Sequence, residues 1–218
     1  MKNILHLSHT DISSDSRILK ELDALTQCDS NYSIYAIGVN DSRELHKTNN
    51  RRGFVLTQIN LWSRRLGLLP DLIRHVLSLF EVIIKMTFLG IKSRPNIIHC
   101  HDTLVLPVGA IVKLFTNAKL VYDAHELESN RNGLSPFLGK LTFKLEKILW
   151  PFVDHLIVVS PSIEKWYLKN IGDKPVTIIL NSPVFPLDVD VYNKNYLYEK
   201  FNIPNEKKIF LYIGIIGK

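Results

Sequence analysis

Residues 96–128 constrain the fold more than any other part of the sequence. A short apolar run at 97–100 is typical of a strand, the apolar residues of 104–115 have helical spacing, and a second strand pattern begins at 120–122. Two such strands joined by a helix run parallel and are connected by a right-handed crossover. This stretch therefore predicts a βαβ unit.

The patterns on both sides extend this unit into a larger sheet. Strands are expected at 4–8, 32–39, 54–61, 97–100, 120–122, 155–160 and 176–180, with helices after Asp15 and at 71–92, 104–115, 137–152 and 162–170. Residues 40–52 are polar and predict a loop. Strands with helices between most of them indicate a Rossmann-like α/β fold, which is a doubly wound, mostly parallel sheet with helices on both faces.

The end of the chain follows a different pattern. Residues 1–183 are expected to form the Rossmann-like domain and residues 184–207 a linker, with a short helix at 195–201. The apolar segment 208–214 predicts a new strand, and a strand needs neighbours for its backbone groups. We therefore expect residues 208–218 to open an incomplete second domain of a longer protein.

Polar residues follow both strands of the central βαβ unit. His101 and Asp102 come directly after the first strand, and Asp123, His125 and Glu126 come at the end of the second. Ligands of open parallel sheets bind outside the carboxyl ends of the strands. The sequence therefore predicts a binding site at this edge.

The composition narrows the class of partner and the compartment. With 46% hydrophobic residues the chain can build a core, and its net charge of +6, concentrated at 51–52 and 64–65, favours an anionic partner. No aromatic residues alternate with the basic ones, so nucleic acid is not an expected partner. Cys28 and Cys100 form no CxxC pair and are expected to be reduced and buried. Together with the expected lack of a signal peptide, this predicts a cytoplasmic protein.

The longest apolar segment, 71–92, allows two interpretations. Its polar residues lie on one narrow helical stripe that consists of Arg74, Ser78, Glu81, Lys85 and Lys92. These ionisable groups argue against a membrane-spanning helix. The segment is either a core helix packed on the sheet or a helix that lies partly in a membrane interface, which the nearby residues 62–65, with one Trp and two Arg, would favour.

The loop after the first strand, residues 9–15, contains no glycine. Nicotinamide and flavin sites of Rossmann folds need glycines there, so a dehydrogenase is excluded. The loop could still hold an anion through the amides of the next helix and Arg17. Alternatively, Asp15 caps that helix and Arg17 is a solvated surface residue.

His99, His101 and His125 suggest a second class of function. Strand alternation places His99 and His101 on one side of the sheet, and His125 with Asp123 could complete a metal site, as in a metal-dependent hydrolase. Buried histidines more often bind backbone or carboxylate groups, and the metal site stays the alternative. Ser160 lies in no GxSxG pattern, and a helix cap is expected there.

Six blocks of the sequence, taken in order, resemble the amino-terminal half of a known enzyme family. They are 15–21 (DSRILKE), 97–102 (IIHCHD), 121–126 (VYDAHE), 156–160 (LIVVS), 176–181 (VTIILN) and 210–214 (FLYIG). The family comprises the retaining, two-domain (GT-B) glycosyltransferases, family 4-like, that build capsule, O-antigen and exopolysaccharide chains in bacteria.

The resemblance implies transfer of a sugar from a nucleotide-sugar donor to a lipid-linked or polysaccharide acceptor, with retention of configuration and without a cofactor or metal. It implies that His125 is catalytic and touches the donor sugar, and that Glu126 orients the loop. The expected substrate-binding residues are Asp15, Arg17, His101, Asp102, Glu126, Ser160 and Asn181.

The same resemblance implies a cellular location and a further carboxyl-terminal domain. The enzyme is expected in the cytoplasm, peripheral to the inner face of the cell membrane and in contact with an anionic lipid surface. Its nucleotide site is expected in a carboxyl-terminal domain, so that this chain alone does not transfer sugar. A non-catalytic truncated relative that keeps only a binding surface is the third interpretation.

Overall fold

The computed structural model describes residues 2–28, 31–40, 49–51, 53–67, 69–131, 133–182 and 195–211. The chain divides into two compact units, Met1–Asn181 and Ser182–Lys218, and each is described by itself. The first unit contains the sheet and the polar residues at its edge. The described part of the second unit contains one short helix, α6 (Tyr196–Lys200).

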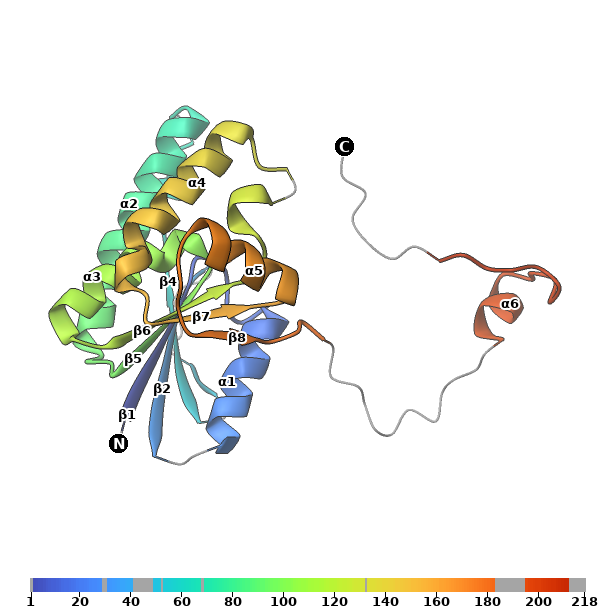
Figure 1. Cartoon of the computed structure of the whole chain (residues 1–218), viewed down its shortest axis with the longest axis horizontal. Helices are drawn as coiled ribbons and strands as arrows, with labels where there is room; N and C mark the ends of the chain where they lie inside the picture. Colours follow the sequence, from blue (N-terminus) through green and yellow to red (C-terminus); the bar gives the residue numbers. More distant parts are fainter. Residues whose placement is uncertain are drawn as a thin grey trace. The chain divides into compact units, whose positions relative to one another are not determined.

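The first unit is built on one sheet, which Figure 1 shows at its centre. Its strands within the described residues are β1 (Lys2–Ser8), β2 (Tyr32–Val39), β3 (Asn49–Arg51), β4 (Phe54–Ile59), β5 (Ile97–His101), β6 (Lys119–Ala124), β7 (His155–Val158) and β8 (Val176–Ile178). They lie in the order β3-β4-β2-β1-β5-β6-β7-β8, and every neighbouring pair is parallel except β3 with β4. The predicted Rossmann-like α/β fold is confirmed.

The order of the strands reverses beside β1. The strands β2 and β4 continue from β1 toward one edge of the sheet, whereas β5, β6, β7 and β8 continue toward the other. Ligands of open α/β sheets bind outside the carboxyl ends of the strands at such a reversal. The fold therefore favours a binding site above the ends of β1 and β5, with β6 as the next strand.

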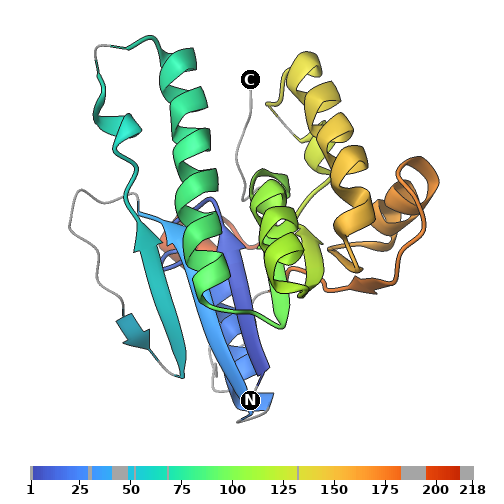
Figure 2. The ribbon, with the colours of Figure 1, turned by 90° about the vertical axis from the view of Figure 1, so that its left-hand side faces the viewer.

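Helices cover both faces of the sheet. They are α1 (Ser16–Cys28), α2 (Asp71–Lys92), α3 (Leu106–Thr116), α4 (Pro136–Leu149) and α5 (Pro161–Asn170), with 3-10 turns η1 (Ser63–Arg65), η2 (Thr103–Val105), η3 (Glu128–Asn130) and η4 (Trp150–Phe152). Figure 2 shows α2 and α3 in front of the strands and α1 behind them. Because each helix follows a strand, α2 and α4 begin at the carboxyl edge, and both extend beyond the strands there (Figure 2).

The two faces of the sheet have separate cores. On one face, buried strand residues such as Leu5, Ile98 and Leu120 pack with side chains of α2, α3, α4 and α5. On the other face, α1 inserts Ile18 and Leu22 into a smaller core over β2 and β4. Successive residues of a strand point to opposite faces. The residues between the apolar ones in β1, β5 and β6 therefore face the α1 side.

Gly109 lets α3 approach the sheet closely. A Cβ atom at this position would collide with Cys100 Sγ and would lie 2.8 Å from Leu120 Cδ1. The small residue in the middle of the helix therefore sets the distance between α3 and the strands β5 and β6, whose ends carry the polar residues.

The helix α2 is not a core helix over most of its length. Only Val82, Met86 and Gly90 are buried. The middle of its polar stripe packs against the preceding turn, because Glu81 accepts hydrogen bonds from the backbone N–H groups of Trp62 (2.8 Å) and Ser63 (2.9 Å). Most of the exposed positions of α2 are apolar and include Leu72 (75% exposed), Phe80, Ile84 and Phe88. Among the described residues, no helix is long and apolar enough to cross a bilayer.

Two smaller expectations were wrong. The polar segment 40–52 contains the short strand β3, which pairs through its backbone with β4 and therefore needs no apolar pattern. The strand expected at 208–214 stays a prediction, because 208–211 have no strand neighbour in the described part of the second unit and 212–214 lie outside the described residues. Cys28 is exposed, whereas Cys100 is buried as expected, and both are free thiols.

Candidate active site

Polar side chains of three adjacent strands meet at the carboxyl edge beside the reversal of strand order. In the register of the sheet, Ser8 of β1 lies beside His101 of β5, and His101 lies beside Asp123 of β6. Two residues earlier, His6 pairs with His99. Strand alternation carries the two histidines of β5 to the α1 side and Cys100 to the opposite core, as the sequence predicted.

Four histidines form a contiguous array. The rings of His99 and His101 stack with centroids 4.3 Å apart, and His6 lies 4.7 Å from His99. His6 Nδ1 and His101 Nε2 are 3.0 Å apart, and His101 Nδ1 and His125 Nε2 are 3.2 Å apart. His101 therefore links a fully buried histidine on β1 to the partly exposed His125 at the end of β6.

Asp123 is the anion at the centre of this array. It is fully buried, and its Oδ1 accepts a hydrogen bond of 2.7 Å from Arg17 Nη2. Arg17 also donates from Nε to Glu21 Oε1 at 3.3 Å. The sequence allowed two interpretations of Arg17, a residue that binds an anion or a solvated surface residue. The structure instead makes it a nearly buried cation between two carboxylates, which ties α1 to β6.

The pKa values of His6, His101 and His125 are shifted in different directions. Burial, followed by the neighbouring rings, lowers the pKa of His6 well below its usual range, and burial lowers the pKa of His101 to about 3. Burial also acts on His125, but the Asp123 and Asp102 carboxylates outweigh it and raise the pKa of His125 above its ordinary value. His125 is thus the histidine of this array best placed to donate a proton or a charged hydrogen bond to a ligand.

Asp102 has a strained backbone. Its φ of 72° and ψ of 162° lie in a region that is nearly confined to glycine. Its carboxylate lies between two histidines, with 3.6 Å from Oδ2 to His9 Nδ1 and 3.5 Å from Oδ1 to His125 Nδ1. Strain of this kind persists only where the surrounding structure enforces it, and it is common in functional sites.

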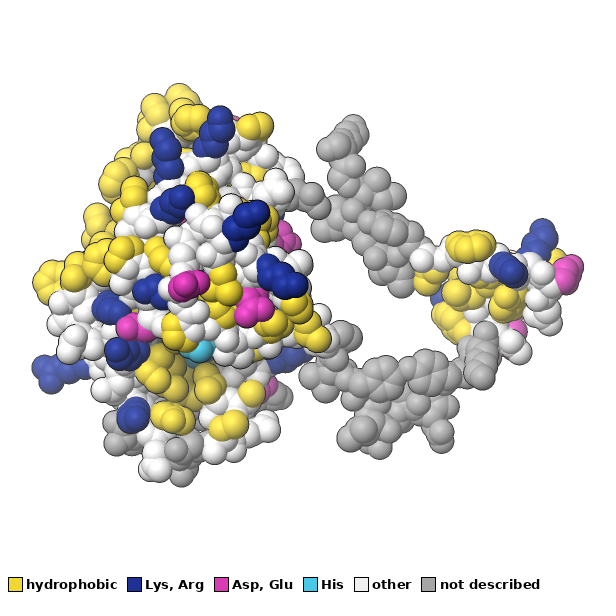
Figure 3. Space-filling view, viewed as in Figure 1, with side chains coloured by type: hydrophobic (Ala, Val, Ile, Leu, Met, Phe, Trp, Pro, Cys, Tyr) yellow, Lys and Arg dark blue, Asp and Glu magenta, His cyan; other side chains and the backbone are white. Residues whose placement is uncertain are grey.

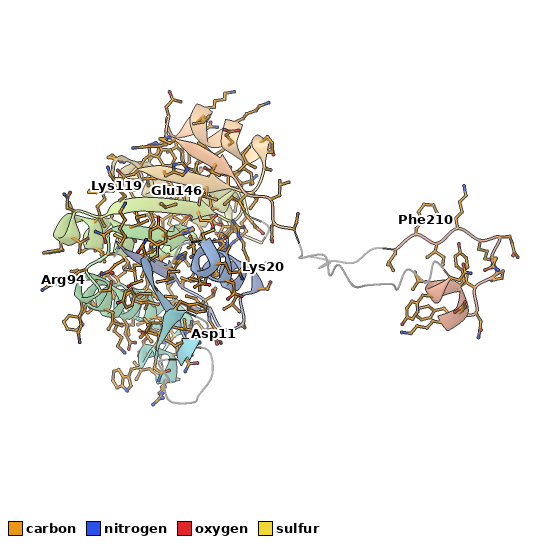
Figure 4. All side chains as sticks on the ribbon, turned by 90° about the horizontal axis from the view of Figure 1, so that it is seen from below. Asp11, Lys20, Arg94, Lys119, Glu146 and Phe210 are labelled. Carbon is orange, nitrogen blue, oxygen red and sulfur yellow. The ribbon has the colours of Figure 1, made fainter. Side chains whose placement is uncertain are left out.

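A buried network enforces this backbone from the other face of the sheet. The Asp102 N–H donates to the Asp123 carbonyl at 3.1 Å. The next residue, Thr103, is held through Tyr122 Oη at 2.7 Å, and Tyr122 donates to Glu146 Oε1 at 2.7 Å. Glu146 lies inside the first unit (Figure 4), where burial raises its pKa. These bonds fix the turn that begins at Asp102.

The remaining predicted site residues lie away from the array or act as caps. Asp15 Oδ1 accepts from the N–H groups of Arg17 and Ile18 at the start of α1, which is the capping role that was the alternative. Ser160 caps α5 by accepting from Ile163 N–H at 3.4 Å. Asn181 is exposed at the end of the first unit. Their roles in substrate binding stay predictions.

Two residues after the exposed Glu126, Glu128 is buried in η3. Burial, followed by the charge of Asp102, raises the pKa of Glu128 to about 8. A protonated carboxyl group therefore stands next to the strained aspartate at neutral pH. The sequence pattern drew attention to Glu126 and missed Glu128, because nothing local shows which way a 3-10 turn presents its residues.

The sequence also missed His6, His9 and Glu21, which the fold adds to the site. Alternation within β1 could have shown that His6 and Ser8 share a face. It could not have shown that this face adjoins His99 and His101, because β1 and β5 are far apart in the chain. The sequence predicted a site at the ends of β5 and β6, and the structure adds residues from β1 and α1 to it.

Comparison with known proteins places this geometry in context. The family model of glycosyltransferase family 4 matches residues 31–182. No curated protein matches the sequence. Among solved structures, sucrose-phosphate synthase from Thermosynechococcus elongatus is similar with a TM-score of 0.61 at 16% identity, over 94% of this chain and 53% of that one.

Two further structures share the fold. HepE from Anabaena in complex with UDP-glucose has a TM-score of 0.57 at 15% identity, over 94% of this chain and 51% of its own. The lipopolysaccharide outer core galactosyltransferase WaaB, in its apo form, has a TM-score of 0.53 at 9% identity, over 85% of this chain and 47% of its own. At these identities the likeness shows the fold alone, and the chain spans about half the length of these proteins.

Proposed function

The chain belongs to glycosyltransferase family 4, and on this basis we propose that it forms the acceptor-side half of an enzyme that transfers a sugar from a nucleotide-sugar donor to a lipid-linked or polysaccharide acceptor. The observation that carries the proposal is His125. It stands at the carboxyl edge beside the reversal of strand order, partly exposed, between the carboxylates of Asp102 and Asp123.

His125 is suited to bind the oxygen atoms of a donor sugar. With a raised pKa it offers an N–H that is charged for more of the physiological range than in a free imidazole. A charge-assisted hydrogen bond to a sugar hydroxyl or phosphate oxygen is stronger than a neutral one. Asp102 and the buried array behind His125 fix the ring, so that little reorganisation is needed when the donor binds.

The donor site is proposed to be shared with a second domain. HepE, whose structure holds UDP-glucose, and the other similar structures are about twice as long as this chain. Positioning two substrates between two walls of a cleft accounts for much of the rate in such transfers. We propose that the nucleotide is bound mainly by that domain, that the sugar is transferred with retention of configuration, and that no cofactor takes part.

The helices α2 and α4 of the first unit, which extend beyond the carboxyl edge of the sheet (Figure 2), offer a surface for the membrane that holds a lipid-linked acceptor. Exposed apolar side chains continue from Trp62 along α2, and α4 adds Phe137, Leu141 and Ile148, interspersed with Lys140, Lys144 and Lys147. Figure 3 shows apolar and basic side chains mixed over this part of the first unit. Arg64 and Arg65 in η1 extend it, whereas Arg52 and the side chain of Arg51 lie outside the described residues. We propose that this surface rests on the anionic inner face of the cell membrane.

The function is tested by His125→Ala in the complete two-domain enzyme. Transfer should fall by about 10²-fold or more, as expected when a positioned acid or base is lost, while the melting temperature changes by a few degrees at most. His155→Ala is the matched control, since His155 binds Thr177 at the opposite end of β7. A large loss of stability with unchanged activity per folded molecule would show that His125 is structural.

A further inference from the structure

The helix α4 carries two grooves that adjoin each other. The first has a volume of about 470 Å³ and is lined by side chains of α4 itself, which include Phe137, Lys140, Leu141, Lys144, Lys147 and Ile148. The second, also of about 470 Å³, lies between α4, η3 and α5. Because Lys140 and Phe143 line both grooves, the two form one depression that leads from the exposed face of α4 to η3.

The second groove begins close to His125. Leu127 lines it, and two residues of chain span at most about 7 Å. Ser129 and Asn130 of η3 add polar groups to the lining, and Trp166 of α5 adds an aromatic ring. Apolar walls with a few polar groups, in a volume of roughly 300–1,000 Å³, are typical of small-molecule sites. This end of the depression therefore suits a polar ring, such as a sugar, near the proposed donor site.

Close packing fixes the walls of the second groove. A Cβ atom at Gly139 would lie 2.5 Å from the carbonyl oxygen of Ser129, so the glycine lets α4 pack directly on the backbone of η3. The ring of Phe143 meets the ring of Trp166 edge to face, with centroids 5.8 Å apart, and joins α4 to α5. The groove is thus held by three packed elements that also carry the chain onward from His125.

The charges along the depression favour an anion. Lys140, Lys144 and Lys147 follow one another at helical spacing on one face of α4, and Lys147 Nζ lies 4.7 Å from the centre of the Phe143 ring. Within the described residues, no acidic side chain lines either groove. The acidic residue of α4, Glu146, is fully buried in the core. Lysines beside apolar side chains suit a ligand that joins an anionic group to a hydrocarbon chain.

We propose that this depression binds the lipid-linked acceptor, with its hydrocarbon chain in the first groove, its phosphate at Lys140 and its sugar toward Ser129 and Asn130. The proposal rests on the sugar transfer proposed above and names the acceptor as a lipid phosphate that carries a sugar. The order of the lining residues, from apolar through basic to polar, matches the order of these three parts. A phospholipid of the bilayer would use the first groove alone, whereas the second leads toward His125.

The hydrocarbon chain can enter the first groove from the membrane. Phe137 is 74% exposed, and Leu141 and Ile148 are also exposed. These residues belong to the surface that is proposed to rest on the bilayer. The depression therefore continues that surface toward the carboxyl edge of the sheet.

The test uses decyl phosphate on the 218-residue chain, below the concentration at which it forms micelles and without any bilayer. One equivalent should bind by calorimetry, whereas inorganic phosphate, which lacks the chain, and decyl maltoside, which lacks the charge, should bind much more weakly. Lys140→Ala should weaken binding about fivefold, which is the effect of one basic side chain beside an anionic lipid. Lys140 is exposed, so the variant should keep its fold, which circular dichroism checks.

Two control variants locate the effect. Lys92→Ala removes an exposed lysine at the far end of α2 and should leave the binding of decyl phosphate unchanged. Phe80→Ser alters the exposed face of α2, outside both grooves, and should also leave it unchanged. The second control separates the depression from the membrane surface as a whole.

The proposal is overturned if decyl phosphate does not saturate at one equivalent, if inorganic phosphate binds as tightly, or if Lys140→Ala binds like Lys92→Ala. An equal loss in Phe80→Ser would show general adsorption and overturn it as well. So would a dimer in sedimentation that Leu141→Ser dissociates, because a second copy would then fill the first groove. Since the probe carries no sugar, a negative result leaves sugar transfer untouched. An enzyme that binds decyl phosphate here but transfers no sugar would refute the function and keep the site.

Discussion

Replacing Asp102 separates backbone strain from side-chain chemistry. Asp102→Ala and Asp102→Gly both remove the carboxylate, but only glycine accepts φ 72° and ψ 162° without strain. The strain is worth about 1–3 kcal/mol, and the greater freedom of glycine in the unfolded chain offsets about 0.5–1 kcal/mol of the relief. We therefore expect the glycine variant to be more stable than the alanine variant by about 1 kcal/mol.

Comparing the stability of Asp102→Gly with that of the unsubstituted chain shows whether Asp102 is kept for stability or for function. The Asp102 carboxylate is 3.6 Å from His9 and 3.5 Å from His125, and ion pairs of this kind contribute about 0.2–1 kcal/mol. Relief of strain is of the same size or larger. Asp102→Gly should therefore equal or exceed the unsubstituted chain in stability, while the same change in the complete two-domain enzyme should lose sugar transfer, which is expected of a residue kept for function.

Urea unfolding of the three proteins measures the difference directly. In a domain of this size, about 1 kcal/mol corresponds to roughly 2–4 °C in melting temperature, so thermal unfolding gives an independent value. Asp102→Asn keeps the shape of the side chain without its charge and separates the ionic contribution. If the alanine variant is as stable as the glycine variant, the backbone at this position is not strained and the reasoning fails.

Four further outcomes are expected. Gly109→Ala should destabilise the first unit by about 1–3 kcal/mol through overpacking against the sheet, whereas Gly67→Ala, which has open space, should not. Burial raises the pKa of Glu128 to about 8 from the ordinary 4.5, so the unfolded chain binds fewer protons between these values. Stability should then fall as the pH rises through this window, by at most ~1.4 kcal/mol per unit, and Glu128→Gln should flatten the curve in urea titrations. In flotation assays the chain should bind anionic vesicles, less so at high salt, and Phe80→Ser should weaken this while Leu114→Ser on α3 should not; equal binding to neutral vesicles would contradict it. The chain by itself should show no nucleotide-sugar binding by calorimetry, and micromolar binding would move the donor site into this half.

The central βαβ unit could be predicted because its information is local. Apolar runs, helical spacing and polar residues at strand ends all lie within residues 96–128, and they gave β5, α3 and β6 together with His101, Asp102 and His125. The contribution of His6 depends on β1 lying beside β5, which is a pairing between distant segments. Register across such a distance is set by the whole sheet, and no local pattern carries it.

The helix α2 shows a second limit of sequence patterns. Periodicity tells which residues share a face, and the stripe from Ser78 to Lys85 was correctly identified as one face. It does not tell which face points inward. Here the polar face is occupied because Glu81 binds the backbone of η1 and Lys85 Nζ donates to the Asn60 carbonyl at 2.7 Å. The apolar face is therefore left exposed.

The unequal cores on the two faces of the sheet have a consequence for amide exchange. The helix α1 is held by the smaller core and by the Arg17 ion pairs, while four helices share the larger core on the other face. Elements with fewer buried apolar contacts open at lower free energy. The amides of α1 should therefore exchange with solvent deuterium before those of α3. Chemical modification of the buried His6 should proceed at the rate at which α1 detaches, and not at the rate of global unfolding.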